Sequence, residues 1–500
     1  RGIAVNIPVW QPENCIQCNR CAYVCPHAVI RPVALTEEEA ANAPEGMTTL
    51  PMTGMKDYKF AITVSAYDCT GCGSCANVCP GKKGAKALAM ENMEANADSQ
   101  KFFDYGVELP VKEDVVAKFK ETTVKGSQFK QPLLEFSGAC AGCGETPYAK
   151  LITQLFGDRM YIANATGCSS IWGNSSPSTP YTVNAKGQGP AWSNSLFEDN
   201  AEFGYGMLLA QKAIRDGLKE KVEDLVANAE NEDVKAAGQE WLDTFSVGAT
   251  NGIATDKLVA ALEACGCEKA QEILAQKDFL SKKSQWIFGG DGWAYDIGFG
   301  GVDHVLASGR DINVMVFDTE VYSNTGGQSS KSTPTGAIAQ FAAGGKEVKK
   351  KDMASIAMSY GYVYVAQISM GADFNQTVKA IAEAEAYPGP SLIIAYAPCI
   401  NHGIKKGMSK AQTEEELAVK CGYWHNFRFN PAAENKFTLD SKAPNMDDYQ
   451  AFLDGEVRYN SLKRQNPEKA ERLFAKNEAE AKERYDYLNK LITLYGADAE

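Results

Sequence analysis

The sequence lacks three features that would indicate a membrane-spanning, a nucleic-acid-binding or a secreted protein. No apolar run reaches the ~18 residues that a membrane-spanning helix needs, and basic residues are outnumbered, 50 against 63 acidic ones. The net charge of -13 argues against nucleic acid as a partner, because phosphate binding requires a basic face. The opening RGIAVNIPVW has neither a methionine nor the order of a signal peptide. We therefore expect a cytoplasmic protein without a membrane span, cut from a longer chain.

Cysteine is the residue type present in unusual number. A chain of 500 residues with 44% hydrophobic content can bury one large core and a satellite domain, so it does not depend on disulfides for stability. Its 15 cysteines are also an odd number. Metal or redox chemistry in a reducing compartment is therefore favoured over a secreted disulfide framework.

Eight of the cysteines lie in two runs with one spacing. CIQCNRCAYVCP at 15–26 and CTGCGSCANVCP at 69–80 both read CxxCxxCxxxCP. Thiolates at every third residue point three sulfurs at one iron-sulfur cubane, while the fourth, beyond the following helix, serves the other cluster. Zinc is the alternative, because CxxC pairs also bind zinc, but eight thiolates with both prolines favour two 4Fe-4S clusters. The ligand sets are Cys15, Cys18, Cys21 and Cys79 for cluster one, and Cys69, Cys72, Cys75 and Cys25 for cluster two.

This pattern resembles two-cluster bacterial ferredoxins over residues 10–90. The 43 residues between Cys25 and Cys69 exceed the compact form of that fold. An inserted hairpin or loop is expected there.

After residue 115 the sequence pattern changes: apolar segments alternate with segments that have helical periodicity. Several of the apolar segments are continuous rather than alternating, as in strands that are buried on both faces, so an α/β fold with a parallel sheet flanked by helices follows. Residues 211–283 are charged, Ala-rich and Leu-periodic, which predicts a helical insertion. The expected strands are 160–165, 284–290, 312–318, 362–368 and 391–398.

Chemically active residues follow four of these strands. Cys168, Asp291, the DTEVYSN segment and Cys399 each come at or just after a strand end. Because parallel sheets bind ligands along the carboxyl edge of their strands, these residues are expected to form one site.

The GDG at 290–292 carries a further prediction. A strand before it, a helix after it and NVMVFDTEVYSN about 28 residues on are typical of thiamine diphosphate binding domains, although a plain glycine turn is the usual alternative. The glycines are expected to let the backbone approach the diphosphate, and Asp291 is expected to hold Mg2+. A helix that begins at Trp293 is expected to direct its free N–H groups at the phosphate. Most thiamine enzymes end this motif with paired asparagines, whereas here the ligand position is Thr319, with the Val321 carbonyl next.

Four more cysteines are predicted to hold a third 4Fe-4S cluster. Cys140 and Cys143 form a CxxC in CAGCGETPYAK, and Cys168 and Cys399 come from strand ends beside the diphosphate. Four separate buried cysteines are the alternative. Three others, Cys265, Cys267 and Cys421, find no partners and are expected to be structural.

Taken together, the chain resembles the C-terminal portion of single-chain pyruvate:ferredoxin (flavodoxin) oxidoreductases, over essentially all of its length. The cluster spacing, CxGCGET, GDGW and TEVYSNTGGQ occur in that family's order. The resemblance implies that Asn324 is catalytic, bonding the substrate oxygen as charge develops, and that Asp291, Thr319 and Val321 hold Mg2+. The implied cofactor contacts are Glu145, Cys168, Gly290, Asp291, Gly292, Trp293, Thr319, Glu320, Val321, Tyr322, Ser323 and Asn324.

The same resemblance implies oxidative decarboxylation of pyruvate to acetyl-CoA and carbon dioxide. Electrons would leave a thiamine-bound radical singly, through three clusters, to ferredoxin or flavodoxin. Coenzyme A, further N-terminal domains of the same chain and a homodimer are also implied. Two alternatives stay open: another 2-oxo acid (2-oxoglutarate, indolepyruvate or oxalate), or an electron-transfer module whose α/β domain is only a scaffold.

The expected domains are a two-cluster ferredoxin-like α+β domain at 1–115, a thiamine diphosphate domain at 116–430 and a C-terminal helical arm at 431–500. Two features are ambiguous. KEVKKKD at 346–352 fits either a solvated face or a surface that attracts acidic groups. His402 fits either a structural histidine or a proton shuttle.

Overall fold

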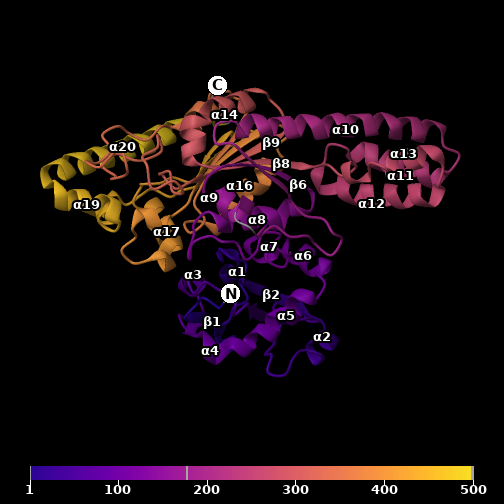
Figure 1. The fold of residues 1–500 in the computed structure, drawn as a ribbon, viewed down its shortest axis with the longest axis horizontal. Coiled ribbons are helices and arrows are strands. Elements are labelled where there is room, and N and C mark those ends of the chain that lie inside the picture. The colour runs from indigo at the N-terminus through magenta and orange to yellow at the C-terminus, as the bar shows by residue number, and fades with distance from the viewer. Residues whose placement is uncertain (1, 176–177, 497–500) are drawn as a thin grey trace.

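A computed structural model describes residues 2–175 and 178–496. Figure 1 shows the N-terminal segment beneath a central sheet, with one helical bundle projecting to one side and the C-terminal helices on the other. In the N-terminal segment, β1 pairs antiparallel with β5, and β2, β4 and β3 form a second antiparallel sheet in that order. The second sheet lies between the two cysteine runs, which confirms the expected insertion. The elements are β1 (Asn6–Trp10), α1 (Arg20–Tyr23), β2 (Ile30–Leu35), α2 (Glu37–Ala41), β3 (Leu50–Pro51), β4 (Lys59–Val64), α3 (Ser74–Val78), β5 (Leu88–Asn92), α4 (Met93–Asn96), α5 (Gln100–Glu108), α6 (Glu113–Phe119) and α7 (Val124–Ser127).

The two cysteine loops have the same backbone shape. Gln17 and Gly71, at matching positions, have φ of 57° and 69°, and the next matching pair, Asn19 and Gly73, has 61° and 76°. Glycine adopts this left-handed conformation freely, whereas other residues pay a steric cost. Side-chain hydrogen bonds offset that cost in the first loop: Gln17 donates to Pro51 O (2.9 Å) and Asn19 to Lys125 O (3.0 Å).

The central sheet has eight strands in the order β13-β12-β10-β11-β9-β8-β6-β7. Six are parallel, and β12 and β13 add antiparallel at one edge. Three predicted strands (β6, β8, β9) have the predicted bounds. β10 begins two residues later than predicted, and β11 ends at Tyr396 because Pro398 and Cys399 already belong to the following loop. The strands are β6 (Met160–Ala165), β7 (Ala191–Ser195), β8 (Ser284–Gly290), β9 (Ile312–Asp318), β10 (Tyr364–Ile368), β11 (Pro390–Tyr396), β12 (Phe427–Phe429) and β13 (Phe437–Leu439).

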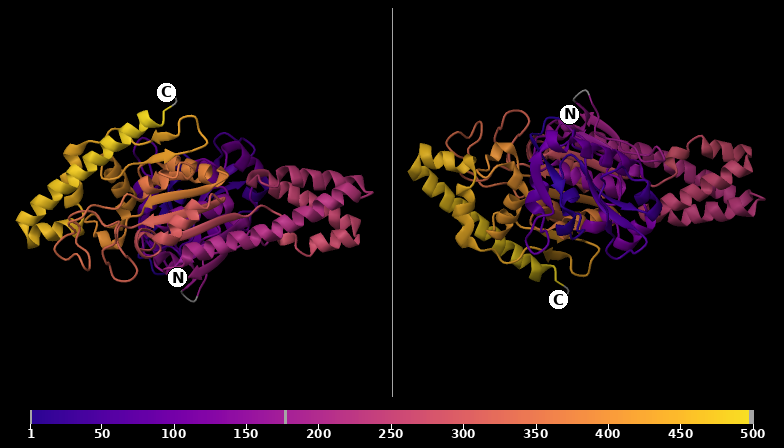
Figure 2. Two further views of the ribbon diagram at one scale, coloured as in Figure 1. Left: turned by 90° about the horizontal axis from the view of Figure 1, so that it is seen from above. Right: turned by 90° about the horizontal axis from the view of Figure 1, so that it is seen from below.

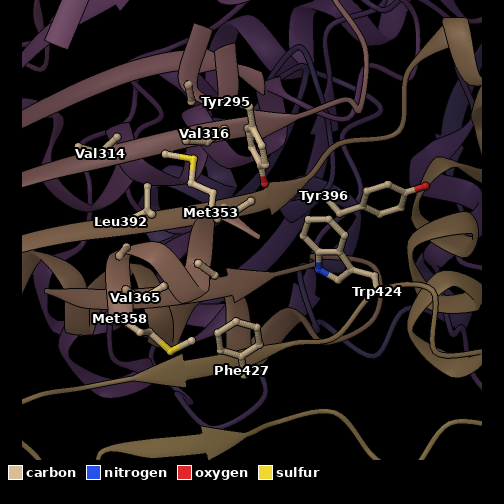
Figure 3. Close-up of a cluster of buried hydrophobic side chains, with 14 of the residues drawn as sticks. Tyr295, Val314, Val316, Met353, Met358, Val365, Leu392, Tyr396, Trp424 and Phe427 are labelled. Carbon is tan, nitrogen blue, oxygen red and sulfur yellow. The ribbon is translucent and has the colours of Figure 1, made fainter. Parts of the chain in front are cut away.

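Both faces of this sheet are buried, as the continuous apolar strands predict. Along β9, Val314 and Val316 enter one hydrophobic cluster, while Met315 and Phe317 enter another on the opposite face. Figure 3 shows the first cluster, in which Val314, Val316, Leu392 and Val365 of the sheet lie near Met353 and Met358. The helices that connect the strands are α8 (Thr146–Phe156), α9 (Cys168–Ser170), α14 (Phe299–Ala307), α15 (Met353–Met358) and α16 (Phe374–Ala386).

The predicted helical insertion is a bundle with its own core. Leu218, Trp241, Leu258 and Ile273 are fully buried in it. Its first helix begins at Asn200, before the expected start at 211, because its N-terminal part packs on the sheet: the Asn200 amide donates to Phe288 O (3.1 Å). The bundle consists of α10 (Asn200–Asn228), α11 (Glu232–Thr244), α12 (Gly248–Cys265) and α13 (Glu268–Leu274).

The C-terminal helices run along the sheet side opposite the bundle (Figure 2). Tyr449, Leu462 and Leu488 are buried in the central cluster, so the C-terminal arm packs against the core of the α/β part from its start to near its end. None of the helices within 2–175 and 178–496 has the length and apolarity to cross a membrane. The last helices are α17 (Ala411–Lys420), α18 (Tyr449–Asp454), α19 (Val457–Gln465) and α20 (Pro467–Leu494).

Candidate functional site

The cysteines of the first two runs are shared between two groups, as their spacing predicts. Burial raises the pKa of the Cys21 thiol, and neighbouring Cys18, Cys15 and Cys79 raise it further, so Cys79 of the second run lies with the first group. The pKa of Cys75 is raised by burial and then by Cys72 and by Cys25 of the first run. Each group therefore contains three thiols from one run and one from the other.

The surroundings of both groups fit thiolates that ligate a cluster. One cavity is lined by Cys25, Cys69, Cys72 and Cys75, the four predicted ligands of cluster two. Backbone N–H groups also donate hydrogen bonds to the cysteine sulfurs. Hydrogen bonds of this kind tune the reduction potential of an iron-sulfur cluster. These bonds are Gln17 N to Cys15 Sγ (3.4 Å), Gly71 N to Cys69 Sγ (3.3 Å) and Ala87 N to Cys79 Sγ (3.3 Å).

A third group of thiols lies at the carboxyl edge of the sheet. Burial raises the pKa of Cys399 to about 12, and the nearby Glu145 and Cys140 contribute to the rise. Burial also raises the pKa of Cys168, to which the nearby Cys399 and Cys143 contribute. The structure thus brings together all four cysteines predicted for the third cluster.

Glycine makes the close approach of these loops possible. Gly144 N donates to Pro398 O (3.1 Å), and a Cβ at Gly144 would lie 2.6 Å from the Pro398 backbone. Any side chain at 144 would therefore push the loop of Cys140 and Cys143 away from Cys399.

The TEVYSN segment touches this third group. Cys168 Sγ lies 3.1 Å from the Ser323 hydroxyl, and the Asn401 amide donates to Ser323 O (3.1 Å). Asn401 N also donates to Cys399 Sγ (3.5 Å). Ser323 therefore contacts Cys168 directly and is linked to Cys399 through Asn401. Asn324 next to it is exposed.

Three oxygens converge where Mg2+ is predicted. The Thr319 hydroxyl lies 3.0 Å from Asp291 Oδ1 and 2.9 Å from Val321 O. The Thr319 hydroxyl has one proton for these two acceptors, so a cation could replace that proton and be held by all three oxygens. Oxygens about 2.9 Å apart also match neighbouring ligands of an octahedron with bonds of about 2.0–2.1 Å. Only one of these three oxygens belongs to a carboxylate. Among residues 2–175 and 178–496, no three His, Cys, Asp or Glu side chains lie close enough together to hold a single metal ion.

Asp291 itself is fully buried at the end of β8. Burial, and then the charge of Asp318, raise its pKa, while the Ser330 hydroxyl donates to its Oδ2 (2.6 Å) and counteracts the shift. A cation at this position would offset the cost of burying the carboxylate.

The GDGW segment departs from the sequence prediction in one respect. Gly292–Ile297 forms a π-helical turn that begins before Trp293, and the α-helix starts only at Phe299. Trp293 is buried in the core between Gly289 and Gly298, where added Cβ atoms would lie 2.3 Å from its ring. The indole of Trp293 thus packs against the backbone of both glycines. A Cβ at Gly292 would lie 2.6 Å from the Tyr322 ring, so this glycine is also required for close packing.

Glu320 points away from the converging oxygens. Its carboxylate accepts hydrogen bonds from Lys350 (2.9 Å) and Arg458 (2.8 Å), and it is buried with φ of 58°. Burial alone would raise its pKa, but Lys350 and Arg458 lower it to about 2. Glu320 is therefore an ionised group that anchors the loop.

The lysine run at 346–352 is only partly a solvated face: residues 347–349 are exposed, whereas three of its lysines pair inward. Lys350 pairs with Asp318 (2.8 Å) as well as Glu320, Lys346 donates to Ser330 O (2.6 Å), and Lys351 donates to Tyr295 O (3.1 Å). Sequence reasoning missed Ser330 and Lys350 as site residues, and it included Asp318 only as the first residue of the DTEVYSN segment, without a role. The available signal was position, since Asp318 directly precedes the predicted ligand Thr319 and Ser330 follows TEVYSNTGGQ.

Two further buried groups border the site. The Trp172 indole donates to Glu145 (2.7 Å), whose pKa burial raises to about 7. The ring of His402, placed in contact with Thr319 O (2.7 Å), is fully buried, which lowers its pKa to about 3. A neutral histidine with this bond matches the structural alternative.

Replacement of Arg458 by methionine should destabilise the protein by about 3–5 kcal/mol, because it leaves Glu320 and Glu456 buried without their shared cation. The matched control is Lys463→Met on the same helix, whose pair with Asp454 is exposed and contributes about 0–1 kcal/mol. Denaturant unfolding followed by circular dichroism measures both. Equal shifts in the two variants would contradict the expectation.

Comparisons with known families match two parts of this geometry. The thiamine pyrophosphate enzyme C-terminal TPP binding domain matches residues 247–395, and the 4Fe-4S dicluster domain matches residues 14–83. The first range contains Asp291 and Thr319, and the second contains both cysteine runs. The chain thus carries regions for thiamine diphosphate and for 4Fe-4S clusters.

Three curated relatives resemble the chain from end to end. A pyruvate-flavodoxin oxidoreductase of Enterobacter agglomerans is 57% identical over 99% of this chain, one of Klebsiella pneumoniae is 54% identical over 98%, and a pyruvate:ferredoxin oxidoreductase of Moorella thermoacetica is 57% identical over 98%. In each case the chain covers 42% of the relative.

A solved 2-oxoglutarate:ferredoxin oxidoreductase of Magnetococcus marinus aligns at 15% identity and a TM-score of 0.31, over 53% of this chain and 65% of that chain, a likeness too weak to support an argument. The curated relatives and the two domain matches show the family of this chain. The chain belongs to the family of pyruvate-flavodoxin and pyruvate:ferredoxin oxidoreductases, of whose members it spans less than half the length.

Proposed function

We propose that this chain is the electron-transferring and thiamine-binding part of an enzyme that oxidatively decarboxylates pyruvate to acetyl-CoA and carbon dioxide. The observation that carries the proposal is the contact of Cys168 Sγ with Ser323, in the loop that begins with the predicted Mg2+ ligands Thr319 and Val321. A low-potential acceptor would thus lie beside the reacting cofactor.

The chain's own residues have distinct parts in this proposal. Asp291, Thr319 and the Val321 carbonyl would hold Mg2+, and the backbone of Gly290, Gly292 and Trp293 would face the diphosphate. When bound, thiamine diphosphate supplies a nucleophilic carbon and an electron sink for decarboxylation. A larger set, Glu145, Cys168, Glu320, Tyr322, Ser323 and Asn324, would border the cofactor, with Asn324 as the residue nearest the substrate oxygen.

We further propose three clusters, one at each group of thiols, that pass electrons in a definite order. The Gly142 N–H, in the loop of Cys140 and Cys143, donates a hydrogen bond to the Cys72 sulfur. This bond lowers the pKa of Cys72, which burial raises. Cys21 in turn lies close enough to Cys75 to contribute to the rise of the Cys75 pKa. Electrons would pass from the group of Cys168 and Cys399 to that of Cys72, and then to that of Cys21.

The partners and domains extend this proposal. Ferredoxin or flavodoxin would accept the electrons, and coenzyme A the acyl group. The segments missing relative to the longer relatives would complete the thiamine site, in a cytoplasmic homodimer. Within the chain, we propose a ferredoxin-like domain at 1–115, a thiamine diphosphate domain at 116–430 and an arm at 431–500.

The test is to prepare the full-length protein without oxygen and add single 2-oxo acids, with and without coenzyme A. Pyruvate should bleach the cluster absorbance, in a protein with one thiamine diphosphate and about 12 irons per chain. Stronger bleaching by 2-oxoglutarate, indolepyruvate or oxalate would reassign the substrate. About 8 irons, no thiamine diphosphate and no bleaching would instead identify an electron-transfer module.

A further inference from the structure

Two cysteines that serve none of the sites above face each other at a helical turn. Cys265 ends α12, and Cys267 immediately precedes α13. Gly266 between them has φ of 61°, a left-handed conformation that glycine adopts without strain and that reverses the chain. As a result the two Sγ atoms lie 2.9 Å apart.

This pair is accessible and remote from the cofactor site. Cys267 is exposed and Cys265 is partly exposed. Figure 1 shows α12 and α13 in the bundle that projects beyond the sheet, and Leu262, Ala270 and Ile273 below the turn belong to that bundle's separate core. An external reactant could therefore reach the sulfurs without disturbing the clusters.

The two thiols differ in character. A hydrogen bond from Cys265 lowers the pKa of Cys267, and the N–H groups of Ala270 and Lys269 lower it further. The same hydrogen bond raises the pKa of Cys265, which acts as its donor. Because the thiolate is the reactive form, Cys267 is suited to attack first and Cys265 second.

We propose that Cys265 and Cys267 form a surface dithiol that closes reversibly to an intramolecular disulfide by exchange with a disulfide of a small thiol or of another protein. The Cys267 thiolate attacks one sulfur of the external disulfide, forms a mixed disulfide and releases the first thiol. Cys265, losing its proton, then attacks Cys267 Sγ and releases the second thiol. The protein is oxidised by two electrons, and the external disulfide is reduced to two thiols.

The contact shows that Cys265 and Cys267 are partners of each other, although the sequence indicated no partner for either. Disulfides in a reducing compartment are usually transient, and exposed ones are the more easily reduced. A pair at an exposed turn can open and close without repacking a core. Cys421, the third cysteine without a cluster role, is buried and serves as an internal control.

The experiment uses the full-length holoprotein under anoxia with bis(2-hydroxyethyl) disulfide as the probe, followed by alkylation, digestion and mass spectrometry. We expect the peptide that contains both cysteines to be unalkylated and lighter by two hydrogens, and dithiothreitol to restore alkylation. Full alkylation of both cysteines, or a lasting mixed disulfide in the unaltered protein, would overturn the proposal.

Two single variants test the order of attack. Cys265→Ser should accumulate a stable mixed disulfide on Cys267, whereas Cys267→Ser should react at least about tenfold more slowly. Unchanged far-ultraviolet circular dichroism in both variants shows that the helical bundle keeps its fold. Equal rates in the two variants, or no adduct on Cys267, would refute the proposed roles.

Discussion

Asp291→Asn should weaken the binding of thiamine diphosphate with Mg2+ at least about 100-fold, which corresponds to about 2.7 kcal/mol. The carboxylate is the only charged member of the three converging ligands, and Mg2+ depends on hard, anionic oxygens. Asparagine has the same shape and retains an oxygen for the Thr319 N–H, which donates to Asp291 Oδ1 at 3.2 Å. The loss should therefore come from charge and not from a collapsed loop. Titration of thiamine diphosphate into the cofactor-free full-length protein, monitored by tryptophan fluorescence, measures the affinity.

The matched control is Asp303→Asn on α14, whose carboxylate accepts a hydrogen bond from the Tyr360 hydroxyl (2.7 Å) away from the converging oxygens. It should bind the cofactor as the unaltered protein does. Both variants should keep their iron, because the thiol groups depend on other loops. If the two variants lost affinity equally, the assignment of Asp291 to the cation would be wrong.

The strands of the central sheet could be predicted from sequence because burial on both faces leaves a clear signature. β6, β8 and β9 are continuous apolar runs, and such runs are typical of parallel strands covered by helices. Their ends could then be placed on one edge by the rule for parallel sheets. This is why Cys168, Asp291 and Cys399 were expected together.

The grouping of the cysteines could be predicted for a different reason. Their spacing indicates which thiols lie together, including the exchange of the fourth cysteine between the two runs, without knowledge of the loop shape. The left-handed conformations of Gln17 and Asn19 could not be read in the same way. They depend on side-chain hydrogen bonds to Pro51 and Lys125, which are distant in sequence.

The charged groups around the cofactor loop escaped prediction because they are tertiary. KEVKKKD has the composition of an exposed segment, yet Lys350 is held inside by Asp318 and Glu320. Glu320 in turn is paired with Arg458, 138 residues away. A charge run alone does not reveal a buried partner on another element, and α10 likewise began early because its first turns pack on β8.

Cys168→Ala should remove the third cluster, lowering the iron content from about 12 to about 8 per chain. The remaining clusters would still be reduced by dithionite, because their ligands lie in the N-terminal segment. Pyruvate, however, should no longer bleach them, because the cluster proposed for the thiol group next to Ser323 would be the acceptor nearest the cofactor. Iron analysis and anaerobic absorbance spectra measure both effects.

Cys421→Ala provides the comparison, because Cys421 is also a cysteine of the α/β part but is buried in the hydrophobic cluster. It should keep about 12 irons and full bleaching by pyruvate. Retention of about 12 irons in Cys168→Ala would contradict the third cluster. Loss of iron with pyruvate bleaching intact would leave the cluster assigned but remove it from the electron path, because the substrate would then reach the N-terminal clusters by another route.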